Sequence, residues 1–304
     1  MFSHAPSLIA AQRRRSPSSP LRPVAARHRV FGPGAPFDTA GLPYMRDIAA
    51  FAGVALRPDF DPYTALCNSY ASMSRAMLDA LGPLGHVDGI LVAHSTPELG
   101  STSPAFALST ALPSARLAFA VSDQGTASPY TALRIAGDLV RGAGLRRVLL
   151  VVLEASTLPY DTRPPEETVP VRDSAAAVVL EAGEPGADGP ETATTLAQRA
   201  GLDPRALPGA LARELDGILD GREPEAIVCG AGLDPELIPG HYSGVHTAAP
   251  GRPNTGTWAA LAEPEPAAAT GRPLVLVDFE PLLGCLSAVA LDKPVSGDPV
   301  EVER

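Results

Sequence analysis

Residues 117–156 read LAFAVSDQGTASPYTALRIAGDLVRGAGLRRVLLVVLEAS. The pattern predicts a short apolar strand, a tight polar turn, an amphipathic helix and a second apolar strand. A turn between a strand and a helix N-terminus presents backbone N–H groups and the positive end of the helix dipole, which stabilise negative charge. Many α/β enzymes mount a nucleophile at such a turn. The turn here, SDQGTAS at 122–128, contains no cysteine.

Composition excludes several classes of function. The 304 residues include 24 Lys and Arg against 34 Asp and Glu, a net charge of −10, so no domain-scale basic surface is expected for nucleic acid. The three cysteines are widely spaced and form no CxxC pair, which predicts neither disulfides nor a metal site and makes a reducing cytoplasm the expected location. No apolar run reaches the roughly 18–20 residues of a membrane span, so no membrane association is expected.

The chain is predicted to form one domain between two tails. Residues 1–28 are expected to be a disordered N-terminal tail, because their charges follow only a very short apolar patch. Residues 29–292 are the predicted domain, and the Gly/Pro-rich stretch 182–191 divides it into an N-half, 29–182, and a C-half, 183–292. Residues 293–304 are expected to be a flexible C-terminal tail.

Helical patterns alternate with short continuous apolar runs in both halves. Strands are predicted at 87–93, 117–121, 146–153, 174–181, 225–229, 273–279 and 286–291. Helices are predicted at 62–82, 103–112, 127–142, 206–220 and 255–262. This alternation is typical of an α/β fold whose buried sheet has helices on both faces.

Four stretches together resemble the thiolase fold, and within it the ketoacyl-ACP synthase III family. They are VDGILVAHSTP at 87–97, AFAVSDQGTASPYTAL at 118–133, the strands within 146–181, and PGRPNTGTWAALAEP with the closing strands at 250–291. The resemblance covers most of 87–182 and 225–292. It implies a thiolase-like fold of two pseudo-repeated βαβ halves, layered α-β-α-β-α.

The resemblance also implies which catalytic residues are missing. Active members attack an acyl thioester with a cysteine at the elbow, since a thiolate is nucleophilic at neutral pH. That position falls on Gly125 when counted forward from AFAV, and on Thr126 when counted back from YTAL, because this turn has one extra residue. The family histidine corresponds to Gly230 in AIVCGAGL, whereas the family asparagine is retained as Asn254 in PNTG.

Two hydroxyl groups at the elbow are candidate nucleophiles. Thr126 or Ser128 could attack a thioester if a histidine served as base, and His94, His241 and His246 are the candidates for that base. The alternative is that both hydroxyls cap the helix, and that His94 is a core residue. His241 and His246 lack a third ligand nearby, so no metal site is predicted.

Further residues are expected to border the site. Asp123 and Gln124 either face the pocket or stabilise the turn. Gly284 and Cys285 lie in the GCLS turn, which resembles the family's glycine-rich loop with its oxyanion-hole N–H, although Cys285 is also explained as a small buried side chain.

These features predict a divergent ketoacyl synthase III-like protein of a natural-product or fatty-acid-like pathway. It would transfer an acyl group from acyl-ACP or acyl-CoA without carbon–carbon condensation, either through Thr126 or by orienting an external nucleophile. The alternative is a catalytically inactive partner subunit of a heteromeric ketosynthase. A homodimer or such a heterodimer is expected, and no cofactor is implied beyond the phosphopantetheine arm that carries the substrate.

Overall fold

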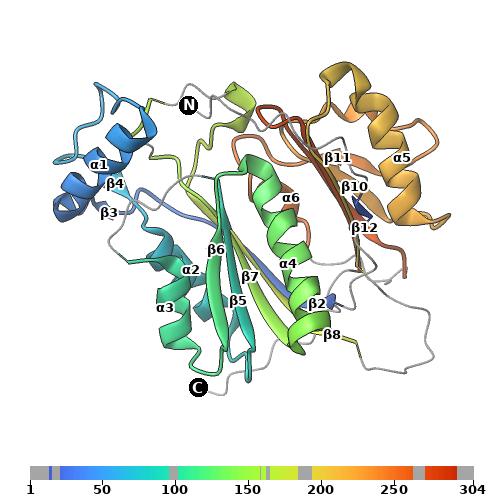
Figure 1. Ribbon diagram of the computed structural model, residues 1–304, viewed down its shortest axis with the longest axis horizontal. Helices are drawn as coiled ribbons and strands as arrows, with labels where there is room; N and C mark the ends of the chain where they lie inside the picture. The colour runs from blue at the N-terminus through green and yellow to red at the C-terminus, as the bar shows by residue number, and fades with distance from the viewer. Residues whose placement is uncertain are drawn as a thin grey trace.

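The computed structural model describes residues 14–15, 21–95, 102–157, 159–161, 165–183, 194–262 and 271–292. Two β-sheets face each other across a central helical layer, and further helices cover the outer faces of both sheets (Figure 1). The order helix, sheet, helix, sheet, helix confirms the predicted five-layered α/β fold.

The sheet of the N-half has five strands. Their spatial order is β2 (Leu21–Val30), β8 (Ser174–Ala182), β7 (Arg147–Glu154), β5 (Gly89–His94) and β6 (Leu117–Val121). β5 pairs in parallel with β6 and β7, whereas β8 is antiparallel to both β7 and β2. The strands β5, β7 and β8 are buried on both faces, which is why their sequences are continuous apolar runs.

The sheet of the C-half repeats this arrangement. Its order is β9 (Thr195–Arg199), β13 (Cys285–Leu291), β12 (Leu274–Glu280), β10 (Ala226–Cys229) and β11 (Val245–Thr247), with β1 (Arg14–Arg15) added beside β9. The strand β10 is parallel to β11 and β12, and β13 is antiparallel to β12 and β9. The two halves therefore share one strand order and one pattern of pairing, as the predicted pseudo-repeat requires.

Helices occupy three layers around these sheets. The outer face of the N-half sheet packs against α2 (Tyr70–Leu81) and α3 (Pro104–Ala111), and that of the C-half sheet against α5 (Leu207–Leu219). The helices α4 (Ser128–Ala143) and α6 (Gly256–Ala259) lie between the sheets (Figure 1). Short 3₁₀ turns lie at η1 (Thr39–Gly41), η2 (Gly125–Ala127), η3 (Glu166–Thr168), η4 (Pro204–Ala206) and η5 (Pro235–Leu237).

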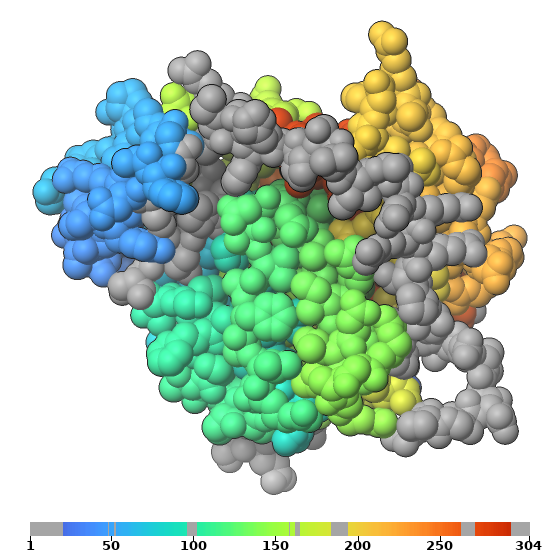
Figure 2. Space-filling view, viewed as in Figure 1, coloured from blue at the N-terminus to red at the C-terminus, as the bar shows by residue number. Residues whose placement is uncertain are grey.

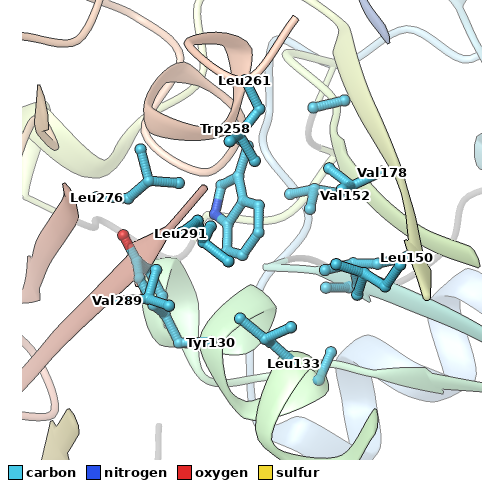
Figure 3. Packing of buried hydrophobic residues seen from close by; sticks show 14 of the residues in the cluster. Tyr130, Leu133, Leu150, Val152, Val178, Trp258, Leu261, Leu276, Val289 and Leu291 are labelled. Carbon is cyan, nitrogen blue, oxygen red and sulfur yellow. The ribbon is translucent and has the colours of Figure 1, made fainter. Parts of the chain in front are cut away.

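Two aromatic side chains join the central helices. Tyr130 of α4 and Trp258 of α6 are fully buried, and their ring centroids lie 5.4 Å apart in an edge-to-face arrangement. Figure 3 shows Trp258 between apolar residues of the two sheets, with Leu276 on one side and Val152 on the other. This one cluster of side chains therefore packs both halves of the chain together.

A small cap extends from the N-half. It consists of β3 (Ala35–Pro36), α1 (Leu42–Ala52) and β4 (Leu66–Cys67), around a separate apolar cluster that includes Phe37, Met45 and Tyr160. In Figure 2 it forms the blue lobe beside the rest of the N-half. The sequence pattern did not predict this element.

The structure corrects the predicted boundaries at several places. Residues 21–28, assigned to a disordered tail, belong to β2, in which Leu21 and Ala26 are buried while Arg22, Arg27 and Arg29 are exposed. Charged side chains on the solvent side are expected of an edge strand. Because of these arginines the sequence of β2 lacks the continuous apolar run from which the other strands were predicted.

Two predicted helices are shorter than expected. The first begins at Tyr70 rather than 62, because the Ser69 hydroxyl caps it by accepting a hydrogen bond from the backbone N–H of Ser72 at 3.1 Å. The helix predicted at 255–262 spans only Gly256–Ala259. The predicted C-terminal tail at 293–304 lies outside the described residues.

Glu154 ties the start of α6 to the N-half sheet. Its fully buried carboxyl accepts hydrogen bonds from the Ser174 hydroxyl at 2.6 Å, from the Asn254 backbone N–H at 2.8 Å and from the Thr255 hydroxyl. Burial raises the pKa of Glu154 to about 7, although these donors act in the opposite direction. The carboxyl is therefore protonated in the folded chain over a pH range in which it is ionised in the unfolded chain.

This pKa predicts a loss of stability as pH rises. Between the ordinary value of 4.5 and about 7 the folded state binds the extra proton, so the free energy of unfolding falls by about 3 kcal/mol across that window. Glu154→Gln should remove this part of the pH dependence of the free energy of unfolding. The new amide can donate to the Ser174 and Thr255 hydroxyls, and its oxygen can accept from the Asn254 backbone N–H. Urea unfolding at pH 5 and pH 7 measures the difference.

The exposed Glu166→Gln variant is the matched control and should keep the wild-type pH dependence. Equal pH slopes for the wild type and Glu154→Gln would contradict the role given to Glu154.

Candidate functional site

The predicted elbow is present. β6 ends at Val121, the turn passes through Asp123 with a φ of 62°, and η2 leads directly into α4. The Asp123 carboxylate accepts a hydrogen bond from the Ser122 hydroxyl at 2.7 Å. Asp123 thus stabilises the turn, one of the two roles considered for it.

A carboxylate of the C-half lies against Gly125, one of the two positions that the resemblance assigns to the nucleophile. Gly125 has a φ of +52°, and a Cβ built on it would lie 1.8 Å from Oε2 of Glu280. The same Oε2 accepts a hydrogen bond from the Thr126 backbone N–H at 3.0 Å, and Oε1 accepts one from the Leu282 N–H at 3.2 Å. Glu280 therefore caps the beginning of the helix from another strand, and a side chain at 125 would displace its carboxylate.

A second carboxyl group lies against Gly230, the position that the resemblance assigns to the family histidine. A Cβ on Gly230 would lie 2.0 Å from Oδ1 of Asp278 and 2.4 Å from Oδ2. The φ of Gly230 is not positive, so the close approach of Asp278 is what requires glycine there. Strand alternation places Asp278 and Glu280 on the inward face of β12, beyond Leu274 and Leu276.

Asp278 is a buried acid with few and long hydrogen bonds. It is 1% exposed; Oδ2 accepts only a long 3.5 Å hydrogen bond from the Thr257 hydroxyl, and Oδ1 has no partner. Burial and the neighbouring charge of Glu280 raise the pKa of Asp278 well above its ordinary value, although hydrogen bonding from the Phe279 backbone N–H and from the Thr257 and Thr126 hydroxyls acts in the opposite direction. Burial also raises the pKa of Glu280.

The two candidate nucleophiles are buried and do not cap the helix. Thr126 is 3% and Ser128 0% exposed, and neither hydroxyl has a hydrogen-bond partner. No side chain within the turn makes a cap hydrogen bond to η2 or to α4. The structure therefore does not support helix capping by the Thr126 or Ser128 hydroxyl. The Thr126 backbone N–H is instead capped by the Glu280 carboxylate.

Gln124 belongs to a polar network beside the elbow. Its Oε1 accepts a 2.6 Å hydrogen bond from the Thr131 hydroxyl, one turn into α4. Gln198 of β9 continues the network through contacts with Thr131 at 3.2 Å and Ser287 at 3.3 Å. Gln124 thus fixes the elbow to its own helix, in keeping with a turn-stabilising role.

Asn254 lies at the N-terminus of α6, as the resemblance implies. Its Nδ2 donates to the Leu153 carbonyl at 2.9 Å, and its Oδ1 is buried without a partner. The side chain is thus anchored on β7, next to Glu154.

The histidines considered as bases lie elsewhere. His94 alternates with Ile90 and Val92, which face α2 and α3, and its ring packs 5.0 Å from that of Tyr70. His246 is exposed on the edge strand β11, and His241 is exposed beside Tyr242. The structure therefore does not bring these histidines to the elbow hydroxyls.

Gly284 and Cys285, in the turn between β12 and β13, make contacts within their own hairpin. The Gly284 N–H, expected to contribute to an oxyanion hole, donates to the Pro281 carbonyl at 3.4 Å. Cys285 pairs with Glu280 across the hairpin and is buried, with its Sγ 3.9 Å from the Ser287 hydroxyl. Burial raises the pKa of Cys285, so its thiol borders the acid pair in protonated form.

Among the described residues, no group of three or more His, Cys, Asp or Glu side chains could hold a metal ion. Within the same residues, no helix has both the length and the apolar character to cross a membrane.

Comparison with solved structures identifies the fold. A 3-oxoacyl-(acyl-carrier protein) synthase from Burkholderia xenovorans LB400 matches with a TM-score of 0.55 and 18% identity over 94% of this chain and 97% of that one. AbyA1, a tetronic acid condensing enzyme, matches with a TM-score of 0.55 and 17% identity over 90% and 99%. The 3-oxoacyl-(acyl carrier protein) synthase III FabH of Pseudomonas aeruginosa PAO1 matches with a TM-score of 0.52 and 18% identity over 90% of this chain and 98% of that one.

These similarities show the fold alone. The chain has the thiolase-like fold of ketoacyl synthase III structures, as the resemblance in sequence implied. No protein-family model matches the sequence, and no curated protein matches it.

Asp278, Glu280 and Tyr130 lie at the elbow, but they are not among the site residues predicted from the sequence. The signal for the first two was present in PLVLVDFEP, because two acids at alternate positions of a buried apolar strand must share one face. Tyr130 lies one turn beyond Thr126, but only its burial without a hydrogen-bond partner marks it.

The contact between Gly230 and Asp278 predicts a strong coupling. Gly230→Ala should lower the free energy of unfolding by on the order of 3 kcal/mol, because the new methyl group overlaps the carboxyl. In the Asp278→Ala background the same substitution should cost at least 1 kcal/mol less, about the coupling expected for residues in contact. Denaturant unfolding of the wild type, the two single variants and the double variant completes this double-mutant cycle. Additive changes in the free energy of unfolding would contradict the overlap between the methyl group and the carboxyl.

Proposed function

We propose that this chain binds an acyl thioester carried by ACP or CoA, and transfers its acyl group without forming a carbon–carbon bond. The observation that carries the proposal is the acid pair at the site: carboxyl groups of β12 lie against Gly125, one of the two positions that the resemblance assigns to the nucleophile, and against Gly230, the position that it assigns to the histidine. Such a pair supplies the site with acid–base groups. The pathway would be of the natural-product or fatty-acid-like type, and the setting a reducing cytoplasm.

The acid pair supports transfer to an external acceptor. A carboxylate offers about four lone-pair sites, and backbone N–H groups occupy two on Glu280, so it keeps the capacity to accept a proton. Its raised pKa brings it closer to neutral pH, where a general base works best. Thr126 has no histidine beside it, which favours Glu280 as base for an acceptor over an acyl-threonine intermediate.

Direct transfer predicts turnover without a covalent adduct. Incubation with an acyl-CoA and acyl-ACP series should give acyl transfer, with no mass increase of the protein by intact mass spectrometry. Glu280→Gln should reduce the rate by about 100-fold, the lower range for loss of a general base. The exposed Glu223→Gln variant should retain the wild-type rate.

An acyl adduct that disappears in Thr126→Val would replace direct transfer by an acyl-threonine route. Absence of both turnover and adduct across chain lengths would reject the transfer proposal.

A second candidate function is an inactive partner subunit, and two observations favour it. Glu280 already occupies the Thr126 N–H that an acyl oxyanion would use. The strand β6 is an edge of its sheet, and Leu117, Ala118 and Ala120 on it are exposed. An apolar edge strand is a template for pairing with another chain, either a second copy or a ketosynthase.

The partner candidate predicts a complex that depends on β6. Ala118→Lys with Ala120→Lys should convert a dimer into monomers on size-exclusion chromatography, because charge on an edge strand opposes pairing. The assay uses the chain alone and the chain co-expressed with a neighbouring ketosynthase. Ala50→Lys, on the exposed side of α1, should leave the complex intact. A monomer in both preparations would contradict pairing through β6.

A further inference from the structure

An arginine and a histidine lie together where β2 meets the segment that leads into α6. Nη1 of Arg252 is 3.1 Å from Nε2 of His28, and both side chains are half-buried. His28 is paired across the sheet with Ala176, which packs in the central cluster, so its ring lies on the face of the sheet that carries α6. The contact therefore joins the N-half to the C-half at the margin of the central layer.

The histidine in this contact is a neutral acceptor. A guanidinium has no atom that accepts a hydrogen bond, so the contact requires an Arg252 N–H to donate to an unprotonated Nε2 of His28. Burial and the charge of Arg252 lower the pKa of His28 to about 4, which keeps the ring uncharged at neutral pH. The pair therefore carries one full positive charge, that of Arg252.

No carboxylate of the described residues neutralises this charge. The chain has 34 Asp and Glu against 24 Lys and Arg, and two other half-buried arginines use them: Arg147 lies 3.0 Å from Glu181, and Arg199 lies 3.7 Å from Glu214. Within the described part of the chain, the hydrogen-bond partner of the Arg252 side chain is His28 alone. A guanidinium that is partly removed from water without a counter-charge is costly to stability.

The two buried acids of the neighbouring elements are held by other groups. Glu154 accepts its hydrogen bonds from Ser174 and from the start of α6. Each carboxylate oxygen of Asp173, just before β8, accepts two hydrogen bonds, one oxygen from Ser156 and the other from Asn68. Neither acid is turned to Arg252, so its positive charge is left for a group from outside the chain.

We propose that Arg252 and His28 form a binding site for a phosphate group. The guanidinium presents five N–H donors in a planar fork, and His28 occupies one of them. The remaining donors can hold two phosphate oxygens side by side, the geometry for which arginine is suited. Because the two side chains are only half-buried, a phosphate can reach them from solvent, while their partial burial reduces the screening of the charges.

Two sources can supply the phosphate group. One is the pantetheine arm that carries the acyl group in the proposed function, and the other is free inorganic phosphate. Apolar surface next to the charge favours the organic phosphate: Val171 is 65% exposed, and a Cβ on Gly251, the neighbour of Arg252, would lie 2.0 Å from its Cγ2. The carrier arm as source rests on the proposed function, whereas the phosphate site itself does not.

The test measures binding of inorganic phosphate, 4′-phosphopantetheine and pantetheine to the full chain by calorimetry at pH 7. The two phosphates should bind, 4′-phosphopantetheine more tightly, and pantetheine should bind weakest because it lacks the phosphate. Arg252→Gln should weaken the binding of both phosphates on the order of tenfold, since charge-assisted hydrogen bonds are lost. Arg252→Lys should restore part of the affinity, because it keeps the charge but not the fork. Arg46→Gln, exposed on α1, is the matched control and should bind as the wild type does.

The histidine resonances in NMR spectra provide a second readout. Bound phosphate should raise the pKa of His28 from about 4 towards its ordinary value of 6.5, because the negative charge of the ligand offsets that of Arg252. Spectra of His28→Gln identify the His28 signal, and this variant should fold normally, since the glutamine oxygen can still accept from Arg252. The signals of His241 and His246, both exposed, are internal controls and should not move when phosphate is added.

The outcomes separate this inference from the proposed function. If the wild type binds neither phosphate, if Arg252→Gln binds them as tightly as the wild type, or if phosphate leaves the titration of His28 unchanged, the site is overturned. Tighter binding of 4′-phosphopantetheine supports the carrier arm as ligand, and equal binding of the two phosphates supports the site with the free ion as its ligand. Failure of acyl transfer overturns the proposed function and leaves the phosphate site standing.

Discussion

A buried glutamate at the start of each central helix is the interaction on which the rest of the structure depends. Glu154, at the end of β7, receives the Asn254 N–H of the C-half, and Glu280, at the end of β12, receives the Thr126 N–H of the N-half. Each carboxyl satisfies helix N–H groups that have no partner within the helix. Each half thus supplies the cap that the other half's helix needs, so neither central helix is completed by its own half alone.

This reciprocal capping explains the unusual site. The Glu280 carboxyl lies where a Cβ at 125 would be, and the positive φ of Gly125 independently favours glycine there. Asp278 has the same effect on Gly230. The two glycines and the two acids therefore form one packing arrangement, in which each carboxyl lies where a Cβ on the facing glycine would be. A buried acid pair is costly to stability, and buried acids with raised pKa values are candidate functional groups.

Several elements followed from local pattern, and others did not. The runs GILVAH, RVLLVVLE and SAAAVVLE predicted β5, β7 and β8, because strands buried on both faces contain little except apolar residues. The strand β2 was not predicted, because its arginine-containing sequence resembles that of a disordered tail. The elbow turn was located from its position between strand and helix, whereas the roles of Thr126 and Ser128 could not be assigned, because a hydroxyl at a helix start has the same sequence signature whether it caps or not.

By itself the sequence determined the alternation of strands and helices, the absence of a thiol from the elbow and the glycine at 230, since these depend on residue identity and short-range periodicity. Only the tertiary structure decided that carboxyl groups of β12 lie against Gly125 and Gly230. The Thr126–Glu280 contact joins residues 154 positions apart, and no local preference encodes such a pairing. The physical reason is that a side chain's environment comes from the elements packed against it. A turn that lacks its thiol in sequence is, in the folded chain, a turn closed by a carboxylate from the other half.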